Sequence, residues 1–374
     1  MSGISIFQQL LKTENVIDTF FATESRKRPV ILFAAGFALK WRYRQMQDEG
    51  FNVVCACDND KSKHGSEILG LKILSLEDSM LKYPDAIYVI ASSIYFDEIR
   101  DQLLKVVGLH NVCTIDFDGC RYFRGGQFKA FLAAHLPEFD ELYSSLADEQ
   151  SRTVLYNVVK GLLSGQREDF ARVFTDDQYL FDSLMKPWGG ETYICGGAYD
   201  GGTILEFLEA AGDLGYKRII AFEPDEEYYE KLENTVKTHA IKNIELVKKG
   251  TWNTSGQLQF AGGGMGRSVI KECNQSFFAA EVQQTIEVLT IDDYLNGDCA
   301  DIIKMDIEGA EKNSLIGAEK TIRKYKPRLA ICVYHNVEDY IKIPQIIRGF
   351  VPEYKLYLRH HGKNCDETVL YAVE

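Results

Sequence analysis

The sequence lacks several features that would point to particular classes of protein. It has no apolar run as long as a membrane span. Residues Met1 to Leu11 have no basic start followed by an apolar core, so we expect no secretory signal and a cytoplasmic protein. The nine cysteines include no CxxC pair, which disfavours a disulfide framework or a zinc ribbon. The formal net charge of −13 opposes binding to nucleic acid, because such binding depends on neutralising phosphates.

The length of 374 residues predicts two domains, since one hydrophobic core rarely organises so long a chain. Two series of strand-like runs alternate with helical patterns, which is typical of α/β domains with mainly parallel sheets. We expect an N-terminal Rossmann-like domain over 1–125, a helical connector over 126–174 and a second Rossmann-like domain over 175–374. The strand-like runs of the first series are Val30 to Ala34, Val53 to Cys57, Ile87 to Ala91 and Val112 to Ile115.

The second series ends in a way that differs from the first. Its last two runs are separated only by His360 to Glu367, which is too short for a helical crossover, so we expect an antiparallel hairpin. Short β-like runs and a glycine cluster between Val247 and Ile302 predict an insertion at the rim of the sheet. The crossing strands and the hairpin are expected at Thr192 to Ile194, Ile219 to Phe222, Ile244 to Val247, Ile302 to Met305, Leu329 to Val333, Lys355 to Arg359 and Thr368 to Ala372.

A glycine-rich turn is the strongest single motif. The run from Tyr193 to Thr203 reads YICGGAYDGGT and lies where a strand gives way to a helix. Glycine there lets the backbone approach a ligand, and the first helical amides point at that ligand. Glu223 follows the next strand, roughly twenty residues on, where a ribose hydroxyl acceptor is needed. The turn alone could be structural, but the two features together indicate a nucleotide-cofactor site.

Several further motifs in the same order carry a resemblance to the FkbM methyltransferase family over roughly 175 to 374. The resemblance implies a class I methyltransferase sheet and transfer of a methyl group from S-adenosylmethionine, typically to an oxygen of a sugar or natural product. The partner would then be a small-molecule or glycan acceptor, and the chain could form a homodimer. The motifs are Glu191 to Thr203, Phe222 to Asp225, Gly250 to Trp252, Leu289 to Leu295, Ile303 to Glu311 and Tyr334 to His335.

The same resemblance implies roles for individual residues. Glu223 would bind the ribose hydroxyls of the cofactor. Cys195 stands where the family usually has an acid, and Gly202 stands where it often has another, which removes a polar contact to the methionine moiety. The remaining residues assigned to the cofactor are Gly197, Ala198, Asp200, Thr203 and Trp252.

Acidic residues and a histidine follow the fourth and fifth strands of the second series. Asp306, Glu308 and His335 are the candidate catalytic residues, because ligands bind outside the carboxyl ends of such strands. His335 titrates nearest neutrality and is the candidate base, with Asp306 orienting the acceptor hydroxyl. Together with Glu311 these residues could also hold a divalent ion. Acids at the start of a helix are favoured by its dipole, so we expect no metal.

The N-terminal domain has a weaker signal. Its first turn supplies only Gly36 against the dinucleotide pattern, and Leu39 is too bulky for close pyrophosphate packing. Asp58 nevertheless ends the second strand, as in modules associated with nucleotide sugars. The alternative is that this domain is a degenerate scaffold or dimerisation domain. Two alternative functions for the whole chain stay open, a non-catalytic nucleotide- or nucleotide-sugar-binding protein and an NAD-dependent enzyme.

Overall fold

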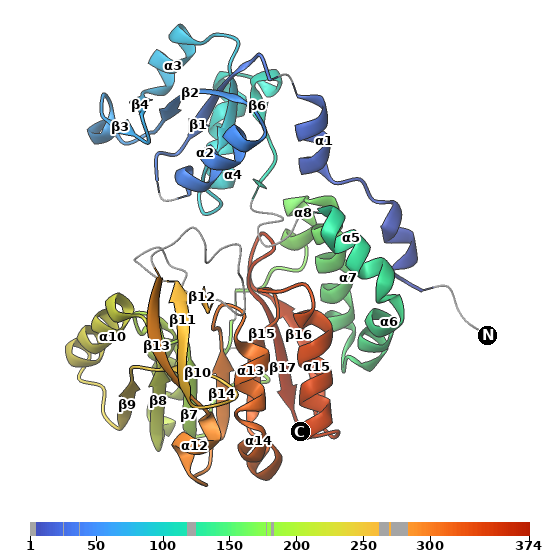
Figure 1. Cartoon of the computed structure of the whole chain (residues 1–374), viewed down its shortest axis with the longest axis vertical. Helices are drawn as coiled ribbons and strands as arrows, with labels where there is room; N and C mark the ends of the chain where they lie inside the picture. Colours follow the sequence, from blue (N-terminus) through green and yellow to red (C-terminus); the bar gives the residue numbers. More distant parts are fainter. Residues whose placement is uncertain are drawn as a thin grey trace.

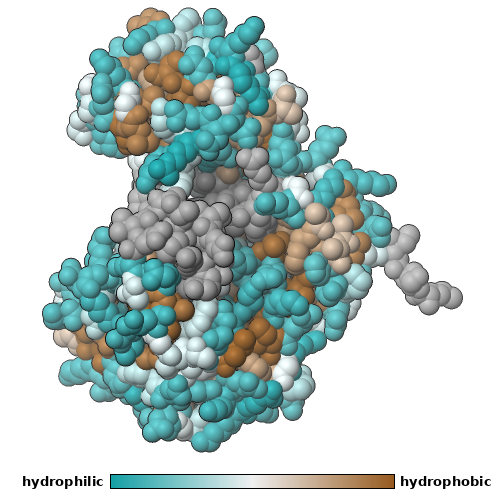
Figure 2. All heavy atoms as spheres, in the orientation of Figure 1, coloured by the Kyte–Doolittle hydropathy of each residue, from teal (hydrophilic) through white to brown (hydrophobic). Residues whose placement is uncertain are grey.

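Two α/β domains and a group of helices make up the molecule (Figure 1). The computed structural model describes residues 5–24, 26–36, 38–117, 125–176, 178–180, 183–261, 269–270 and 283–374. None of the helices in these ranges is long and apolar enough to cross a bilayer. The surface on the face shown in Figure 2 is mainly hydrophilic, with an apolar area on the N-terminal domain.

The N-terminal domain contains a six-stranded sheet in the order β3-β4-β2-β1-β5-β6. All neighbouring strands are parallel except the β3–β4 hairpin, so the predicted Rossmann-like arrangement is confirmed. The hairpin and α3 were not predicted because their patterns are too short to show a period. The elements are η1 (Gln8–Lys12), α1 (Val16–Thr23), β1 (Pro29–Phe33), α2 (Leu39–Asp48), β2 (Asn52–Cys57), η2 (Lys61–Lys63), β3 (Glu67–Ile68), β4 (Leu71–Leu74), α3 (Leu76–Lys82), β5 (Ile87–Ile90), α4 (Phe96–Val106), η3 (Leu109–Asn111) and β6 (Val112–Cys113).

The C-terminal domain contains a seven-stranded sheet in the order β16-β17-β15-β14-β7-β8-β9. The first five strands in sequence are parallel, and β16 and β17 form the predicted antiparallel hairpin. This confirms the expected class I methyltransferase sheet. Its elements are β7 (Thr192–Gly196), α9 (Gly202–Ala211), η5 (Gly212–Leu214), β8 (Arg218–Phe222), α10 (Glu226–Thr238), β9 (Ile244–Val247), α12 (Ile291–Leu295), β14 (Ile302–Met305), α13 (Glu311–Ile316), α14 (Glu319–Tyr325), β15 (Arg328–Cys332), α15 (Asp339–Phe350), β16 (Lys355–His360) and β17 (Thr368–Val373).

A small second sheet occupies the predicted insertion. Its order is β10-β13-β11-β12, and β11 pairs with β13 in antiparallel fashion. Of the β-like run expected at Arg267 to Lys271, only Val269 and Ile270 belong to the described residues, and the glycine cluster before it lies outside them. The strands are β10 (Gly250–Thr251), β11 (Gly256–Ala261), β12 (Val269–Ile270) and β13 (Gln283–Leu289).

Four helices lie between the two domains in sequence and pack against the C-terminal one. They are α5 (Gly125–Ala134), α6 (Leu136–Ser145), α7 (Glu149–Ser164) and α8 (Arg167–Ala171). One hydrophobic cluster joins their buried side chains to those of the sheet and α15, and it also includes Phe7 and Leu10. The segment predicted as a connector therefore shares a core with the C-terminal domain. Figure 1 shows these helices beside α15 and β16.

This shared core predicts that Phe170→Ala destabilises the C-terminal domain. Phe170 is fully buried, its ring lies 2.6 Å from where a Cβ on Gly161 would stand, and it packs 5.5 Å from the His360 ring of β16. Removing a buried aromatic ring typically costs about 3 to 5 kcal/mol. Chemical denaturation should show that loss, whereas Ile94→Ala, at an 88% exposed position, should cost little. Equal stability of the two variants would contradict the shared core.

Candidate functional site

A cavity of about 380 Å³ opens at the carboxyl ends of β7, β8 and β14. The turn after β7, the end of β8, the small sheet, the end of β14 and the loop between β16 and β17 all contribute to its wall. The residues that line the cavity include Gln178, Tyr179, Gly197, Tyr199, Thr203, Glu223, Lys304, Asp306, Glu308, Tyr334 and Glu367.

The turn after β7 depends on Gly197. Its φ is +71°, and a Cβ there would lie 1.9 Å from the backbone oxygen of Asp306. The amides of Gly197 and Ala198 donate hydrogen bonds to the Phe222 carbonyl at 3.1 and 3.0 Å. The Tyr199 amide donates to Oε2 of Glu223 at 2.9 Å. The turn is therefore fastened to both β14 and β8, and glycine is needed at position 197 for conformational and steric reasons.

Glu223 presents a buried carboxyl group to the cavity. It is 6% exposed, and its Oε1 accepts a hydrogen bond from the Asp225 amide at 3.0 Å. Burial raises the pKa of Glu223 to about 7, although the Asp225 and Tyr199 amides oppose the shift. The group therefore changes charge near neutral pH.

The residues predicted to bind the cofactor separate into two groups. Gly197, Thr203 and Glu223 line the cavity, and four others lie elsewhere. The side chain of Cys195 is fully buried in the core, and Ala198 is buried as well. The Oδ1 of Asp200, an exposed residue, accepts a hydrogen bond from the Gly202 amide at 3.1 Å. Trp252 packs in a cluster with Phe260, Ile286, Val288 and Ala310.

Asp306 follows β14 and lines the same cavity. Its Oδ2 accepts a hydrogen bond from the Tyr179 hydroxyl at 2.9 Å, and its Oδ1 accepts one from the Tyr334 hydroxyl at 3.2 Å. Burial opposes ionisation of this carboxyl, but the Lys304 ammonium, His335 and the tyrosine hydroxyl together lower its pKa. Asp306 is therefore an ionised carboxylate held by two phenols.

Lys304 is the buried cation beneath this carboxylate. It is 2% exposed, and its Nζ donates hydrogen bonds to the carbonyls of Gly197 at 2.9 Å and Gly196 at 3.3 Å. Burial disfavours its charge, but Cys195 and Asp306 raise the pKa of Lys304 above its usual value. Lys304 is the one charged residue of the otherwise apolar strand Ile302–Met305, and this pattern in the sequence could have identified it as a functional residue.

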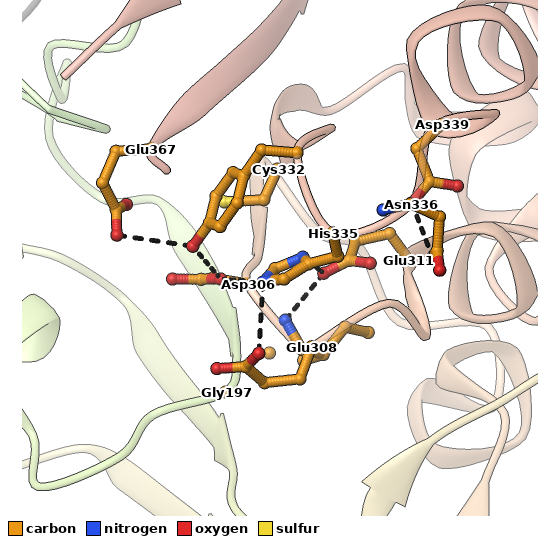
Figure 3. Close-up of polar contacts among 12 residues, drawn as sticks. Gly197, Asp306, Glu308, Glu311, Cys332, His335, Asn336, Asp339 and Glu367 are labelled. Carbon is orange, nitrogen blue, oxygen red and sulfur yellow. Dashed lines mark hydrogen bonds and ion pairs between the residues drawn. The ribbon is translucent and has the colours of Figure 1, made fainter. Parts of the chain in front are cut away.

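His335 lies between three carboxylates rather than in the cavity wall (Figure 3). Its Nε2 is 3.5 Å from Asp306 Oδ1 and from Glu308 Oε2, and its Nδ1 is 3.0 Å from Glu311 Oε1. Burial opposes protonation, but Glu311, Glu308 and Asp306 raise the pKa of His335 to about 10. A ring that already carries its proton at neutral pH cannot accept one, so this geometry disfavours the base role predicted for His335.

The same residues include a possible cation site. Ligand atoms of Asp306, Glu311 and His335 lie within 4.8 Å of one another. Ion pairing with a protonated imidazole accounts for this clustering without a metal. The absence of a metal stays a prediction.

Sequence reasoning missed Glu367 and Gln178. Glu367 lies in the loop between β16 and β17, and its Oε2 accepts a hydrogen bond from Gln178 Nε2 at 2.6 Å. Burial and the Asp306 charge raise the pKa of Glu367 to about 7. Both residues are far in sequence from the recognised motifs, so only the fold brings them to the cavity.

The neighbouring His360 and His361 are buried, and His361 Nε2 lies 2.9 Å from the Tyr371 hydroxyl.

In the N-terminal domain, the carboxylate of Asp58 binds protein groups. Its Oδ2 accepts hydrogen bonds from the Ala35 amide at 2.7 Å and from Lys63 Nζ at 3.0 Å, and its Oδ1 accepts one from the Asp60 amide at 2.8 Å. These contacts stabilise the turn after β1. They favour the scaffold interpretation of this domain over one in which it binds a nucleotide sugar.

Comparisons with known proteins agree with this architecture. Residues 196–365 match the family model described as Methyltransferase FkbM domain, and 26–112 match a model described as C2185-like, N-terminal. A methyltransferase FkbM from Methylobacillus flagellatus KT is 22% identical over 98% of this chain and 96% of its own, with a TM-score of 0.71. This likeness shows a common fold over both domains. No curated protein matches the chain.

Two further solved structures cover about half of the chain. A putative rRNA methylase from Clostridium thermocellum is 12% identical over 54% of this chain and 97% of its own, with a TM-score of 0.34. Fibrillarin from Aeropyrum pernix, solved with bound S-adenosyl-L-methionine, is 11% identical over 50% of this chain and 67% of its own, with a TM-score of 0.32.

The contact between the turn and β14 predicts that Gly197→Ala is more destabilising than an ordinary substitution at positive φ. Gly190 is the matched control, because its φ is +77° and nothing lies within 4 Å of its Cβ position. Gly190→Ala should cost roughly 1 to 2 kcal/mol of unfolding free energy from the left-handed backbone alone. Gly197→Ala should cost about 1 to 3 kcal/mol more, because the methyl group collides with the Asp306 carbonyl. Similar losses in urea denaturation would show that the turn can move away from β14.

Proposed function

Because the chain belongs to the FkbM family of S-adenosylmethionine-dependent methyltransferases through its C-terminal domain, we propose that it methylates a hydroxyl of a sugar or glycan precursor. The observation that carries the proposal is one cavity lined by two sets of groups. The first set is Gly197, Thr203 and Glu223, and the second is Asp306, Tyr179, Tyr334 and Glu367. The first set suits a nucleoside, and the second suits a molecule rich in hydroxyl groups.

The first set fits the cofactor in its donor and acceptor groups. Glu223 offers a buried carboxylate, which can accept hydrogen bonds from the two ribose hydroxyls. Beside this carboxylate, glycine at position 197 lets the turn pack against the Asp306 carbonyl. S-adenosylmethionine, when bound, supplies the methyl group that is transferred.

The second set fits a neutral polyol. Carboxylate oxygens and phenol hydroxyls are partners for sugar hydroxyls, and a set of such groups can fix which hydroxyl points toward the reacting centre. Two lysines line the cavity: Lys304 is occupied by backbone carbonyls and by Asp306, and Lys249 pairs with Glu287 at 2.7 Å. The excess of carboxylates therefore disfavours a phosphate at the reacting end of the acceptor.

The pKa of Glu223 predicts how cofactor affinity changes with pH. The ionised carboxylate binds ribose hydroxyls, so affinity should be highest above the pKa of about 7 and fall as the pH drops through that value. Glu223→Gln should weaken binding of S-adenosylhomocysteine at least roughly tenfold and remove this dependence, since charge-assisted hydrogen bonds contribute about 1.5 to 3 kcal/mol. Calorimetric titration at several pH values gives both quantities.

Glu226→Gln provides the matched control for this titration. Glu226 starts α10 three residues away, and its side chain is 64% exposed. The control variant should keep the affinity and the pH dependence of the unmodified protein. An unchanged affinity in a folded Glu223→Gln variant would contradict the ribose assignment.

The acceptor class can be tested with radiolabelled S-adenosylmethionine. Incubation of the protein with a panel of monosaccharides and nucleoside-diphosphate sugars should yield a labelled methyl ether in at least one case. Mass spectrometry of the labelled product locates the methyl group. Label on nitrogen or carbon, or no transfer to any sugar of the panel, would overturn the proposed reaction.

A further inference from the structure

Glu367 is an acidic residue of the cavity that no motif identified. It precedes β17 in the hairpin loop, and its backbone has a φ of +67°, which non-glycine residues seldom adopt. This conformation places the carboxyl group in the cavity wall together with Asp306 and Tyr334. A strained backbone that aims a side chain into a site is a common feature of functional residues.

A chain of contacts links Glu367 to Asp306. Oε1 of Glu367 lies 3.4 Å from the Tyr334 hydroxyl, which is itself 3.2 Å from Asp306 Oδ1 (Figure 3). Gln178 holds the other oxygen, Oε2, at 2.6 Å. Because the Tyr334 hydroxyl has one proton and Asp306 is the nearer carboxylate, Oε1 of Glu367 is the oxygen left for another donor.

We infer that Glu367 is the general base that takes the proton from the acceptor hydroxyl. This inference rests on the proposed methylation of a hydroxyl group. As the acceptor oxygen forms its bond to the methyl carbon, the methyl–sulfur bond breaks and its electron pair stays on sulfur. The hydroxyl proton passes to the carboxylate of Glu367 and later leaves to solvent. The products are a methyl ether and S-adenosylhomocysteine, so atoms and charge balance.

The other candidates for this role are less suitable. Asp306 has a lowered pKa, and both of its oxygens accept hydrogen bonds from tyrosine hydroxyls. His335 already carries a proton at neutral pH, and its two nitrogens face carboxylates. Glu308 is engaged with His335 at 3.5 Å. A base works best when its pKa is close to the working pH, and the pKa of Glu367 is about 7.

The charges around Glu367 set the direction of its pH dependence. Burial is the largest cause that raises the pKa of Glu367. The carboxylates of Asp306, at the end of β14, and of Asp366, in the same loop, raise it further, so all three favour the protonated form of Glu367. The Gln178 amide and the cationic His335 at the end of β15 favour the ionised form. The Tyr334 and Tyr179 hydroxyls face Asp306 between these groups. Since the base must be ionised, the rate should rise with pH through about 7 and then level off.

The test compares Glu367→Gln with the unmodified protein, using the panel sugar that is methylated fastest. Turnover should fall by roughly 10² to 10⁴, the usual contribution of general-base catalysis, and the rise with pH should disappear. Affinity for S-adenosylhomocysteine should stay within about twofold, because Glu223 and the glycine turn are untouched. Glu367→Asp should recover part of the rate, since it restores a carboxylate at a longer distance.

Asp366→Asn is the matched control, since it changes an acid of the same loop that does not line the cavity. It should keep its maximal turnover, and its rate should still rise with pH, but at a lower pH, because the Asp366 charge no longer raises the pKa of Glu367. An independent readout is the infrared band of protonated carboxyl groups in the ligand-free protein. The difference spectrum against Glu367→Gln should contain one carboxylic acid that ionises near pH 7.

The outcomes separate the two proposals. If the unmodified protein methylates a sugar hydroxyl but Glu367→Gln turns over normally, the role of Glu367 is overturned while the proposed function stands. A difference spectrum without a carboxylic acid near neutral pH would also overturn it. If no sugar of the panel is methylated by the unmodified protein, the proposed function and the inference both fail.

Discussion

Charge pairing at the carboxyl ends of β14 and β15 is the interaction on which the rest of the site depends. Asp306, Glu308 and Glu311 surround His335 at 3.5, 3.5 and 3.0 Å, and a second buried cation, Lys304, interacts with Asp306. Buried carboxylates without such partners would take up protons or force the strand ends apart. With these partners, Asp306 stays ionised and the glycine turn can pack against its backbone carbonyl.

The helices before the C-terminal domain support the same site from the other side of the sheet. Asp148 and Ser151 of the α6–α7 junction bind the buried Arg359 of β16 at 2.8 and 2.9 Å. The Ser151 hydroxyl also accepts a hydrogen bond from the Leu358 amide at 2.9 Å. Because β16 leads into the loop that holds Glu367, these contacts help to fix the position of the hairpin and therefore of its carboxyl group.

The sequence predicted the fold better than it predicted the site. Strand periods and the short link before β17 were sufficient for both sheets and for the terminal hairpin. Motif order also brought Gly197, Glu223 and Asp306 to one cavity. Residues such as Cys195 and Asp200 lie in the same motif but face the core or solvent, because neighbouring residues of a strand or turn point in different directions.

Long-range contacts account for what the sequence did not predict. Tyr179 and Glu367 reach the cavity through a turn and a hairpin loop that carry no pattern of their own. His335 was assigned a base role from its ordinary titration near neutrality, but that assignment ignores the carboxylates that the fold brings around the ring. The sequence likewise predicted the helical segment 126–174 as a connector, because only the structure shows that its buried side chains join the core of the C-terminal sheet.

The protonation state of His335 tests this account most directly. Nitrogen chemical shifts of the labelled imidazole ring report its charge, and the account predicts that both nitrogens stay protonated from neutral pH to above about pH 9, with a pKa near 10. Titration of His335 near its ordinary value of about 6.5 would contradict the account. The imidazole would then be neutral at working pH, and the negative charges of the carboxylates around it would need protons or another cation to neutralise them.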